Sequence, residues 1–186
     1  MFGVPTVGRS RAWLSPEDEL VCAVQDTSWG WMGAVASPRG LRRLTLPRDA
    51  ADHALGEIAD AFGPLPSDAG AFAGLFSRLE RYFAGERISF DVPLDPRGTD
   101  FQLRVWEALR RIPYGETRSY QDVGRMVERP RGAHAVGQAV GRNPLGIVVP
   151  CHRVIAADGT LGGFGGMEQL KSRLLALEGV NVRPSR

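Results

Sequence analysis

The first half of the chain opens with three short apolar runs that are separated by turn-forming residues. The runs cover residues 20–24, 32–36 and 41–46, and the segments between them contain Gly, Pro, Ser and Asp. Because short apolar runs bounded by such residues are typical of β-strands, we expect three consecutive strands. Two later stretches, 50–62 and 71–83, carry apolar residues at helical spacing. The first half is therefore expected to be a small α+β unit, and no cluster of polar residues in it indicates chemistry.

A short segment rich in Pro and Gly interrupts the pattern at residues 93–98. Directly after it, Thr99 and Gln102 have the Thr-x-x-Gln spacing of a capping box, which predicts the start of a helix. We therefore divide the chain into an N-terminal domain (1–92), a linker (93–98), a second domain (99–180) and a tail (181–186).

The second domain contains two short predicted helices joined by a tight turn. The first begins at the capping signal Ser119–Asp122 and runs to about residue 127, and the second covers 133–140. Such a pair is typical of a helix-turn-helix, although many all-α connections share the pattern. The second helix is built mainly from Ala, Val and Gly, which allows either tight packing against another helix or close entry into a nucleic-acid groove. Both interpretations stay open at this point.

A further apolar run at 147–149 predicts a strand that leads into Pro-Cys-His-Arg at 150–153, and the run 154–156 predicts a second strand. A glycine-rich loop at 162–166 follows. The final helix carries an apolar stripe from Met167 to Leu177 and is closed by a glycine.

Cys151 and His152 are the first candidates for chemistry, because a thiol reacts as the thiolate and a nearby imidazole can take its proton. Neighbours in an extended segment point to opposite faces, so a bridging water is expected between them. Glu178 lies in the last turn of the final helix, where the helix dipole disfavours a carboxylate, and Leu174 and Leu175 offer no compensating charge. Glu178 could orient the histidine, as in a catalytic triad. The alternatives are a structural cysteine beside a surface histidine, and an exposed glutamate at a frayed helix end.

The amino-acid composition of the chain excludes several classes of protein. Of 186 residues, 43% are apolar and 24% charged, which is an ordinary globular balance. No apolar stretch is long enough to span a membrane, and two cysteines make neither a disulfide framework nor a zinc site. We therefore expect a cytoplasmic protein without a metal, in which Cys22 is buried and inert.

The net charge of +2 is distributed unevenly. Residues 1–96 carry 9 Arg and 13 acidic residues, a charge of 9 − 13 = −4, and residues 97–186 carry 14 basic and 8 acidic residues, a charge of 14 − 8 = +6. A basic second half suits contact with a polyanion, although a solvated surface would give the same count.

The motifs of the second half occur together in one known family. In the order and spacing that the chain shows, they closely resemble the O6-alkylguanine-DNA alkyltransferases, also called methylated-DNA–protein-cysteine methyltransferases, from about residue 99 to 180. The elements that carry the resemblance are Ser-Tyr at 119–120, Ala-Val-Gly at 135–137, Asn-Pro at 143–144, Pro-Cys-His-Arg at 150–153, the loop 162–166 and the helix end 174–179. The first half matches loosely, through segments at 29–31 and 39–41. The resemblance implies an α+β fold, with a ribonuclease H-like N-terminal domain and a mainly helical C-terminal domain that carries a helix-turn-helix and the active-site cysteine.

The resemblance also implies DNA repair by a suicide transferase. Cys151 would accept the alkyl group of O6-alkylguanine, and possibly of O4-alkylthymine, once and irreversibly, without a cofactor. His152 would act through water as the base and Glu178 would orient it. Tyr120 would donate a proton or hydrogen bond toward N3 of the flipped guanine.

Further residues take substrate-binding roles by the same resemblance. The backbone N–H of Gly165 would serve O6, the carbonyls of Cys151 and Val154 would receive the exocyclic amine, and Asn143 would tie the recognition helix to the active-site segment. The expected partner is double-stranded DNA, bound by a monomer in the minor groove without sequence preference, with the alkylated base flipped out. The expected DNA-binding residues are Gln121, Ala133, His134, Ala135, Gly137 and Arg142.

Two positions depart from the family pattern. His134 replaces an arginine that fills the space of the flipped base, so extrusion or DNA affinity is expected to be weaker unless Arg131 or Arg142 compensates. The loop reads Phe-Gly-Gly-Met at 164–167 instead of aromatic-Ser-Gly-Gly.

Three other functions compete with alkyl transfer. An alkyltransferase-like module binds damaged bases without reacting, but such modules lack the reactive cysteine. A helix-turn-helix regulator would use Cys151 only as a sensor and would bind a specific operator. A cysteine hydrolase would turn over acyl substrates, and no oxyanion hole for it is visible in the sequence.

Overall fold

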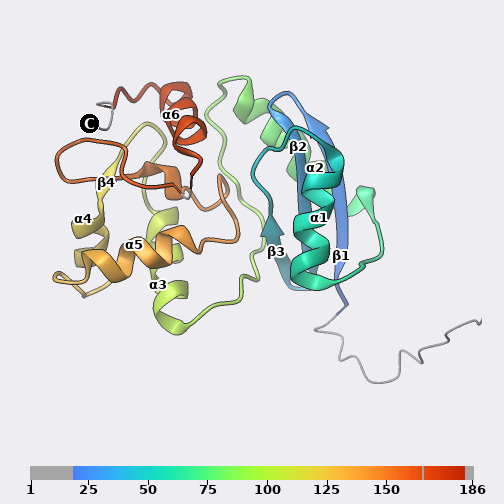
Figure 1. Cartoon of the computed structure of the whole chain (residues 1–186), viewed down its shortest axis with the longest axis horizontal. Helices are drawn as coiled ribbons and strands as arrows, with labels where there is room; N and C mark the ends of the chain where they lie inside the picture. The colour runs from blue at the N-terminus through green and yellow to red at the C-terminus, as the bar shows by residue number, and fades with distance from the viewer. Residues whose placement is uncertain (1–18, 165, 183–186) are drawn as a thin grey trace, which may run out of the picture.

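The computed structural model describes residues 19–164 and 166–182. Figure 1 shows two parts side by side, an N-terminal domain with a three-stranded sheet and a C-terminal domain built mainly of helices. An extended segment, which contains residues 93–98, joins them. Within the described residues, none of the helices combines the length and the apolar character that a membrane crossing requires.

The three predicted strands form an antiparallel meander in chain order: β1 (Val21–Thr27), β2 (Gly30–Ser37) and β3 (Gly40–Leu44). Gly40 has φ +145°, and a Cβ there would lie 2.4 Å from the carbonyl oxygen of Pro93. The glycine thus lets the linker approach the sheet edge, where Leu41 N–H donates to Pro93 O at 2.9 Å. Asp95 of the linker accepts a hydrogen bond from Ser37 at 2.6 Å and pairs with Arg42.

One helix covers each face of this sheet. Helix α2 (Ala69–Phe83) packs Phe76 and Leu79 with Ala34, while α1 (Ala51–Phe62) packs Ile58 with Val35 and Cys22. Because successive strand residues point to opposite faces, the sequence neighbours Ala34 and Val35 enter different clusters. Cys22 is buried among apolar side chains, as expected for a structural thiol.

The C-terminal domain contains the predicted helices: α3 (Asp100–Arg110), α4 (Tyr120–Met126), α5 (Ala133–Gly141) and α6 (Glu168–Leu177). Both expected capping signals are formed, with Thr99 and Ser119 accepting hydrogen bonds from the backbone of Gln102 and Asp122. A two-stranded parallel sheet joins β4 (Arg118–Ser119) to β5 (Val154–Ile155), the second strand expected around Cys151.

The strand predicted at 147–149 is wrong. This segment is a buried turn in which Ile147 has φ +75°, and the side chain of Asn143 holds it by donating to Val149 O at 2.8 Å and accepting from Leu145 N–H at 3.0 Å. The run is apolar because the turn is surrounded by the core, and periodicity alone does not separate that case from a strand. Cys151 consequently begins a 3₁₀ turn, η2 (Cys151–Arg153), instead of lying in an extended segment.

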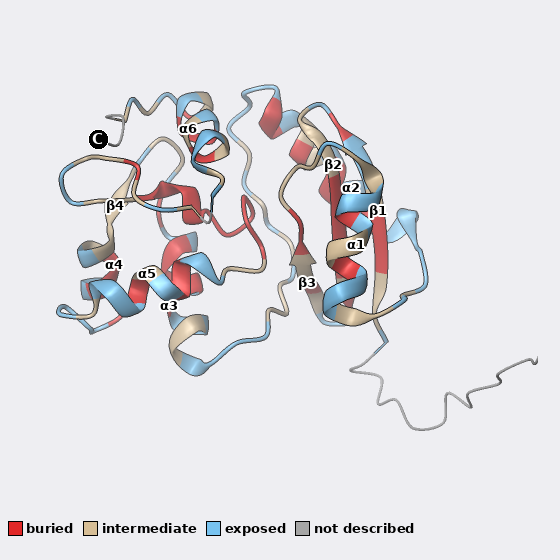
Figure 2. Cartoon of the chain, viewed as in Figure 1, coloured by how far each residue is buried: buried red, intermediate tan, exposed pale blue. Residues whose placement is uncertain are grey.

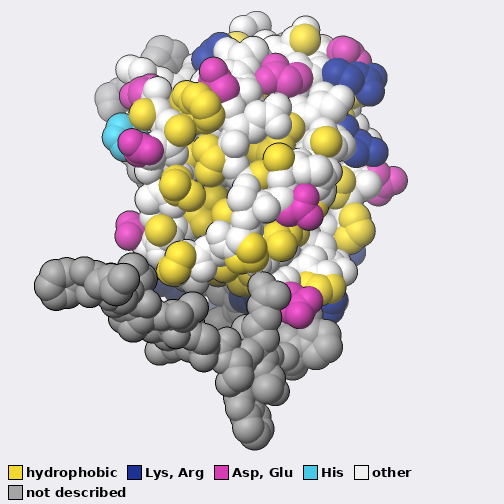
Figure 3. Space-filling model, turned by 90° about the vertical axis from the view of Figure 1, so that its right-hand side faces the viewer, with side chains coloured by type: hydrophobic (Ala, Val, Ile, Leu, Met, Phe, Trp, Pro, Cys, Tyr) yellow, Lys and Arg dark blue, Asp and Glu magenta, His cyan; other side chains and the backbone are white. Residues whose placement is uncertain are grey.

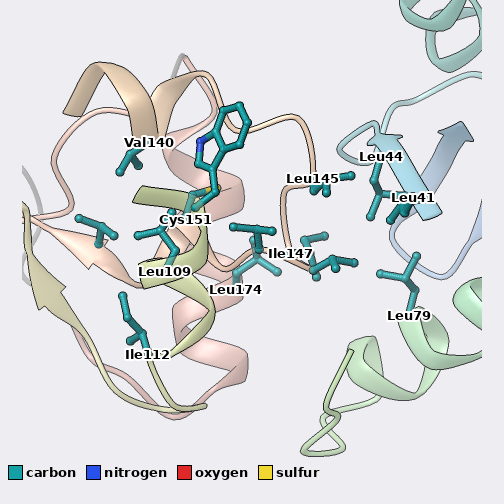
Figure 4. Close-up of a cluster of buried hydrophobic side chains, with 14 of the residues drawn as sticks. Leu41, Leu44, Leu79, Leu109, Ile112, Val140, Leu145, Ile147, Cys151 and Leu174 are labelled. Atoms are coloured by element: carbon teal, nitrogen blue, oxygen red, sulfur yellow. The ribbon is translucent and has the colours of Figure 1, made fainter. Parts of the chain in front are cut away.

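The two domains share one apolar core. Figure 4 shows Leu41, Leu44 and Leu79 of the N-terminal domain facing Leu145 and Ile147 of the C-terminal domain. Backbone hydrogen bonding continues across this contact, since Leu44 N–H donates to Pro144 O at 2.9 Å. Figure 2 shows that β2 and the turn around Cys151 are among the buried segments. The site is therefore placed where the two domains meet.

Candidate active site

Cys151 lines a cavity of about 430 Å³ between the two domains. The thiol residue is only 5% exposed and belongs to the shared core, beside Leu109 and Val140 (Figure 4). Walls of the cavity come from the C-terminal domain, through Tyr120, Gly137, Asn143, Gly163 and Phe164, and from the N-terminal domain, through residues 43–46, Arg48 and Glu57. The Cys151 thiol is thus shielded from bulk water, and the cavity gives access to it.

The structure brings the second and third predicted catalytic residues together. His152 and Glu178 are buried, and His152 Nε2 lies 2.9 Å from Glu178 Oε1. An ionised carboxylate only accepts hydrogen bonds, so Nε2 carries the proton. Among the described residues, His152 Nδ1 has no hydrogen-bond partner. The free nitrogen is therefore an unprotonated acceptor, and burial, which lowers the pKa of His152, keeps the ring neutral.

Glu178 has more partners than the sequence indicates. Arg153 donates to it twice, from Nε to Oε2 and from Nη2 to Oε1, each at 2.9 Å. Tyr82 O–H donates to Oε1 at 2.6 Å and Gly115 N–H to Oε2 at 3.1 Å. Burial alone would raise the pKa of Glu178, but the hydrogen bonds from His152, Arg153 and Tyr82 outweigh it and hold the pKa well below its ordinary range. The compensating partners thus come from outside the helix: the expected His152 and, in addition, Arg153, Tyr82 and Gly115.

Arg153 and Tyr82 were both missed as site residues in the sequence. Arg153 stands inside the Pro-Cys-His-Arg motif, and its adjacency to His152 was the available signal. Tyr82 belongs to the apolar face of α2 and lies 96 residues before Glu178, so no local pattern marks it.

Lys171 is a third missed residue, and it is fully buried. Its ammonium donates to the carbonyls of Val154 and Leu161 at 2.5 Å each and lies 5.6 Å from the ring centre of Phe164. Burial lowers the pKa of Lys171 to about 8, so it is charged at neutral pH. The Val154 carbonyl, expected to receive a base amine, is thus already engaged by one donor, and a carbonyl oxygen has a second lone pair available.

Burial raises the pKa of the Cys151 thiol. Three effects act in the opposite direction: a hydrogen bond from Asn143, the positive charge of Lys171, and backbone N–H groups of the turn that begins at Cys151. The site therefore keeps the thiol protonated until a base takes the proton, while it provides groups that stabilise the thiolate once formed.

Tyr120, the fourth predicted catalytic residue, lines the same cavity as Cys151. Its hydroxyl donates to Gly163 O at 3.4 Å, and burial followed by the nearby Cys151 raises its pKa. A Cβ at Gly162, which has φ +64°, would lie 3.2 Å from the Tyr120 ring, so this glycine lets the loop close over the tyrosine. Gly165, the expected donor to O6, lies outside the described residues.

The small-residue helix α5 packs against the domain with one face and leaves the other exposed, so its structure is compatible with both alternatives left open. Its inner face, including Val136 and Ala139, is buried, and Ala139 O accepts a hydrogen bond from Trp106 of α3 at 2.8 Å. Its outer face leaves exposed most of the expected DNA-contacting residues, namely Ala133, His134 and Ala135, together with Arg142 after the helix and Gln121 on α4. Gly137 is half-buried, and a Cβ there would lie 3.7 Å from the Tyr120 ring.

In the described ranges, no group of three or more His, Cys, Asp and Glu side chains is arranged to hold a metal ion.

Figure 3 shows the outer face of the N-terminal domain, where acidic side chains lie scattered among apolar ones. The acidic side chains on this face agree with the negative charge of the first half.

Family models match both domains. The model described as "6-O-methylguanine DNA methyltransferase, ribonuclease-like domain" matches residues 22–96, and that described as "6-O-methylguanine DNA methyltransferase, DNA binding domain" matches residues 100–180. Together they cover most of the chain and agree with the α+β fold expected from the sequence.

Individual relatives agree with these models. The methylated-DNA–protein-cysteine methyltransferase of Mycobacterium tuberculosis is 58% identical over 111 residues, which cover 60% of this chain and 67% of that protein. A crystal structure of the O6-methylguanine methyltransferase of M. tuberculosis superposes with a TM-score of 0.72 at 43% identity, covering 86% of this chain and 92% of that one. A structure of the M. tuberculosis protein in complex with DNA has a TM-score of 0.72 at 44% identity, covering 85% and 92%. The sequence motifs, the fold and these matches agree: the chain belongs to the 6-O-methylguanine DNA methyltransferase family.

Proposed function

We propose that this protein repairs O6-alkylguanine in double-stranded DNA by moving the alkyl group to Cys151. A bond forms between Sγ and the alkyl carbon while the bond from that carbon to O6 breaks. A base takes the thiol proton, and the guanine that leaves takes up one proton. The chemistry balances without a cofactor, and the thioether product leaves the protein spent after one transfer.

The observation that carries this proposal is the state of His152. Its Nε2–H is fixed by Glu178 and its buried Nδ1 has no partner among the described residues. A buried acceptor without a partner costs free energy, about 1–3 kcal/mol, unless a water fills the position. A water between Nδ1 and the Cys151 thiol would satisfy the nitrogen and carry the proton from sulfur to imidazole. His152 is then the base and Glu178 its orienter.

Groups in and around the cavity would stabilise the guanine leaving group. Tyr120 is proposed to donate toward N3 of a flipped guanine, and the carbonyls of Cys151 and Val154 to accept from its exocyclic amine. Gly165 is proposed to serve O6, and Asn143 to hold the active-site turn against α5. The two contacts in which the protein donates, from the Tyr120 hydroxyl and the Gly165 N–H, would strengthen as negative charge develops on the base.

The exposed face of α5 is proposed to enter the minor groove. Small residues at 133 and 135 allow the backbone to approach, His134 would stack in the space of the flipped base, and Gln121 and Arg142 would contact the flanking backbone. Extrusion of the base costs a few kcal/mol, which the cavity must offset by contacts to it. We propose that the protein acts as a monomer in the cytoplasm, without sequence preference.

A duplex with one radiolabelled O6-methylguanine tests the proposal. Equimolar protein is expected to remove the label completely and retain it in the protein fraction, whereas Cys151→Ala binds the duplex and removes none. Retention of the label on DNA by a protein that binds the damaged site would favour the non-reacting alkyltransferase-like module instead.

A further inference from the structure

One hydroxyl in the network around Glu178 comes from the N-terminal domain. Tyr82 lies near the end of α2, is 1% exposed, and donates its O–H to Glu178 Oε1 at 2.6 Å. The same oxygen lies 3.4 Å from His152 Nε2. Because α2 precedes the linker at 93–98, this hydrogen bond joins the two domains at the buried histidine–glutamate pair.

The position of Tyr82 is fixed from both domains. Its ring packs edge-on against Phe90 and Tyr114, with centroids 5.7 and 6.1 Å apart. The next residue, Phe83, stacks on Trp29 with ring centroids 4.7 Å apart. The guanidinium of Arg173 on α6 lies over the same Trp29 ring, 3.7 Å from its centroid. Trp29 therefore links the end of α2 to α6, the helix that precedes Glu178. Such packing fixes the hydroxyl in place before any substrate binds.

We propose that Tyr82 is a positioning residue for alkyl transfer, which holds the Glu178 carboxylate in the orientation that His152 requires and so makes the N-terminal domain part of the active site. This inference rests on the proposed function, in which His152 takes the thiol proton. Oε1 of Glu178 receives three donors: His152 Nε2, Arg153 Nη2 and Tyr82 O–H. When the tyrosine donor is lost, the Glu178 carboxylate interacts more strongly with the His152 imidazole.

The direction of the effect follows from that charge. The charged groups that act on the pKa of His152 are Glu178, Arg153 and Lys171, and the Tyr82 hydroxyl of α2 lies 3.4 Å from its Nε2. Cys151 is the adjacent residue, and the nearby Tyr114 hydroxyl donates to the Leu177 carbonyl. Removing the Tyr82 hydroxyl strengthens the attraction between carboxylate and imidazolium, which raises the pKa of His152. A protonated imidazole cannot accept the thiol proton, so the rate should fall most at low pH and recover as the pH rises.

Tyr82→Phe tests this, since it removes one oxygen and keeps the ring. Single-turnover transfer from O6-methylguanine duplex is expected to slow about tenfold near neutral pH, the lower end of the loss that follows removal of the hydrogen-bond partner of a metal-ligating histidine. The acid limb of the pH–rate profile should move to higher pH, and affinity for the duplex should stay unchanged. Tyr114→Phe is the matched control, because its hydroxyl donates to the backbone carbonyl of Leu177 at 3.1 Å and not to the carboxylate.

The outcomes separate the two proposals. Absence of transfer by the unsubstituted protein overturns the proposed function. If the unsubstituted protein transfers the methyl group and Tyr82→Phe matches it in rate and pH profile, only the role of Tyr82 is overturned. The same holds if Tyr82→Phe is slower by the same factor at every pH. If Tyr82→Phe does not fold, NMR of the unsubstituted protein decides: the Tyr82 hydroxyl proton should be protected from exchange and should shift as His152 titrates, and a proton that ignores this titration contradicts the inference.

Discussion

Arg153→Met removes the positive partner of a buried carboxylate while it keeps the length of the side chain. The guanidinium is lost from two hydrogen bonds to Glu178 at 2.9 Å and from one to Ile112 O at 2.6 Å. Arg153 is 9% exposed and the Glu178 side chain is fully buried, so water cannot replace these contacts without a rearrangement.

Breaking a buried pair on one side costs about 3–5 kcal/mol, because the remaining charge has no partner. The total free energy of unfolding of a domain this size is about 5–15 kcal/mol, so the variant should lose a large part of it. A loss of this size lowers Tm by about 10 °C. Urea denaturation followed by tryptophan fluorescence, with thermal unfolding alongside, measures both quantities.

The loss should also depend on pH. The pKa of Glu178 is depressed in the folded protein, so its contribution to stability is present above the unfolded pKa of about 4.3 and is lost as pH falls from there through the much lower folded pKa. In Arg153→Met the carboxyl pKa rises, and protonation relieves the unpaired charge. The difference between the two proteins should therefore shrink from pH 7 to pH 4.

Arg110→Met is the control, because Arg110 pairs with Glu107 at the surface at 3.3 Å, where such pairs contribute less than about 1 kcal/mol. A loss below about 1 kcal/mol in Arg153→Met, the size of a surface pair, would refute the reasoning. So would a loss that is the same at pH 7 and pH 4.

Three further predictions follow from the site. Glu178→Gln should slow methyl transfer while duplex affinity in a fluorescence-anisotropy titration stays unchanged, because the histidine loses its orienting charge; unchanged transfer would contradict the assigned role. Lys171→Met should raise the pKa of Cys151 and slow its alkylation by iodoacetamide at pH 7, measured in folded protein, since the positive charge that favours the thiolate is lost; faster alkylation would count against this electrostatic role. His134→Arg should tighten DNA binding, because a longer and permanently charged side chain then fills the space of the flipped base; an unchanged affinity for the duplex would contradict the position proposed for residue 134.

Local signals in the sequence predicted the elements well, because their causes are local. The capping boxes at Thr99 and Ser119 begin helices α3 and α4 as expected. The strands of the meander are bounded by turns whose glycines, Gly30 and Gly40, have positive φ. The pairing of His152 with Glu178 was predicted as well, since a carboxylate in a helix's last turn is unfavourable without a purpose.

Specific side-chain contacts, most of them between distant segments, explain what the sequence left undetermined. The segment 147–149 is held as a turn by the side chain of Asn143, and an apolar run reads alike whether it lies in a strand or in a buried turn. Tyr82 looks like any core residue of α2, and Lys171 like a surface lysine of α6, until the fold places them against Glu178 and Val154. Their functional character comes from tertiary neighbours and not from their own segments.

In the proposed reaction, Cys151 accepts one alkyl group permanently from damaged DNA. Peptide mapping by mass spectrometry, after equimolar incubation with a duplex that contains one O6-methylguanine, tests it most directly. We predict one added methyl group on the peptide that contains Cys151, none on the peptide that contains Cys22, and no further repair by the modified protein. An unmodified Cys151 after incubation, or repair of many duplexes by one protein molecule, would contradict the account.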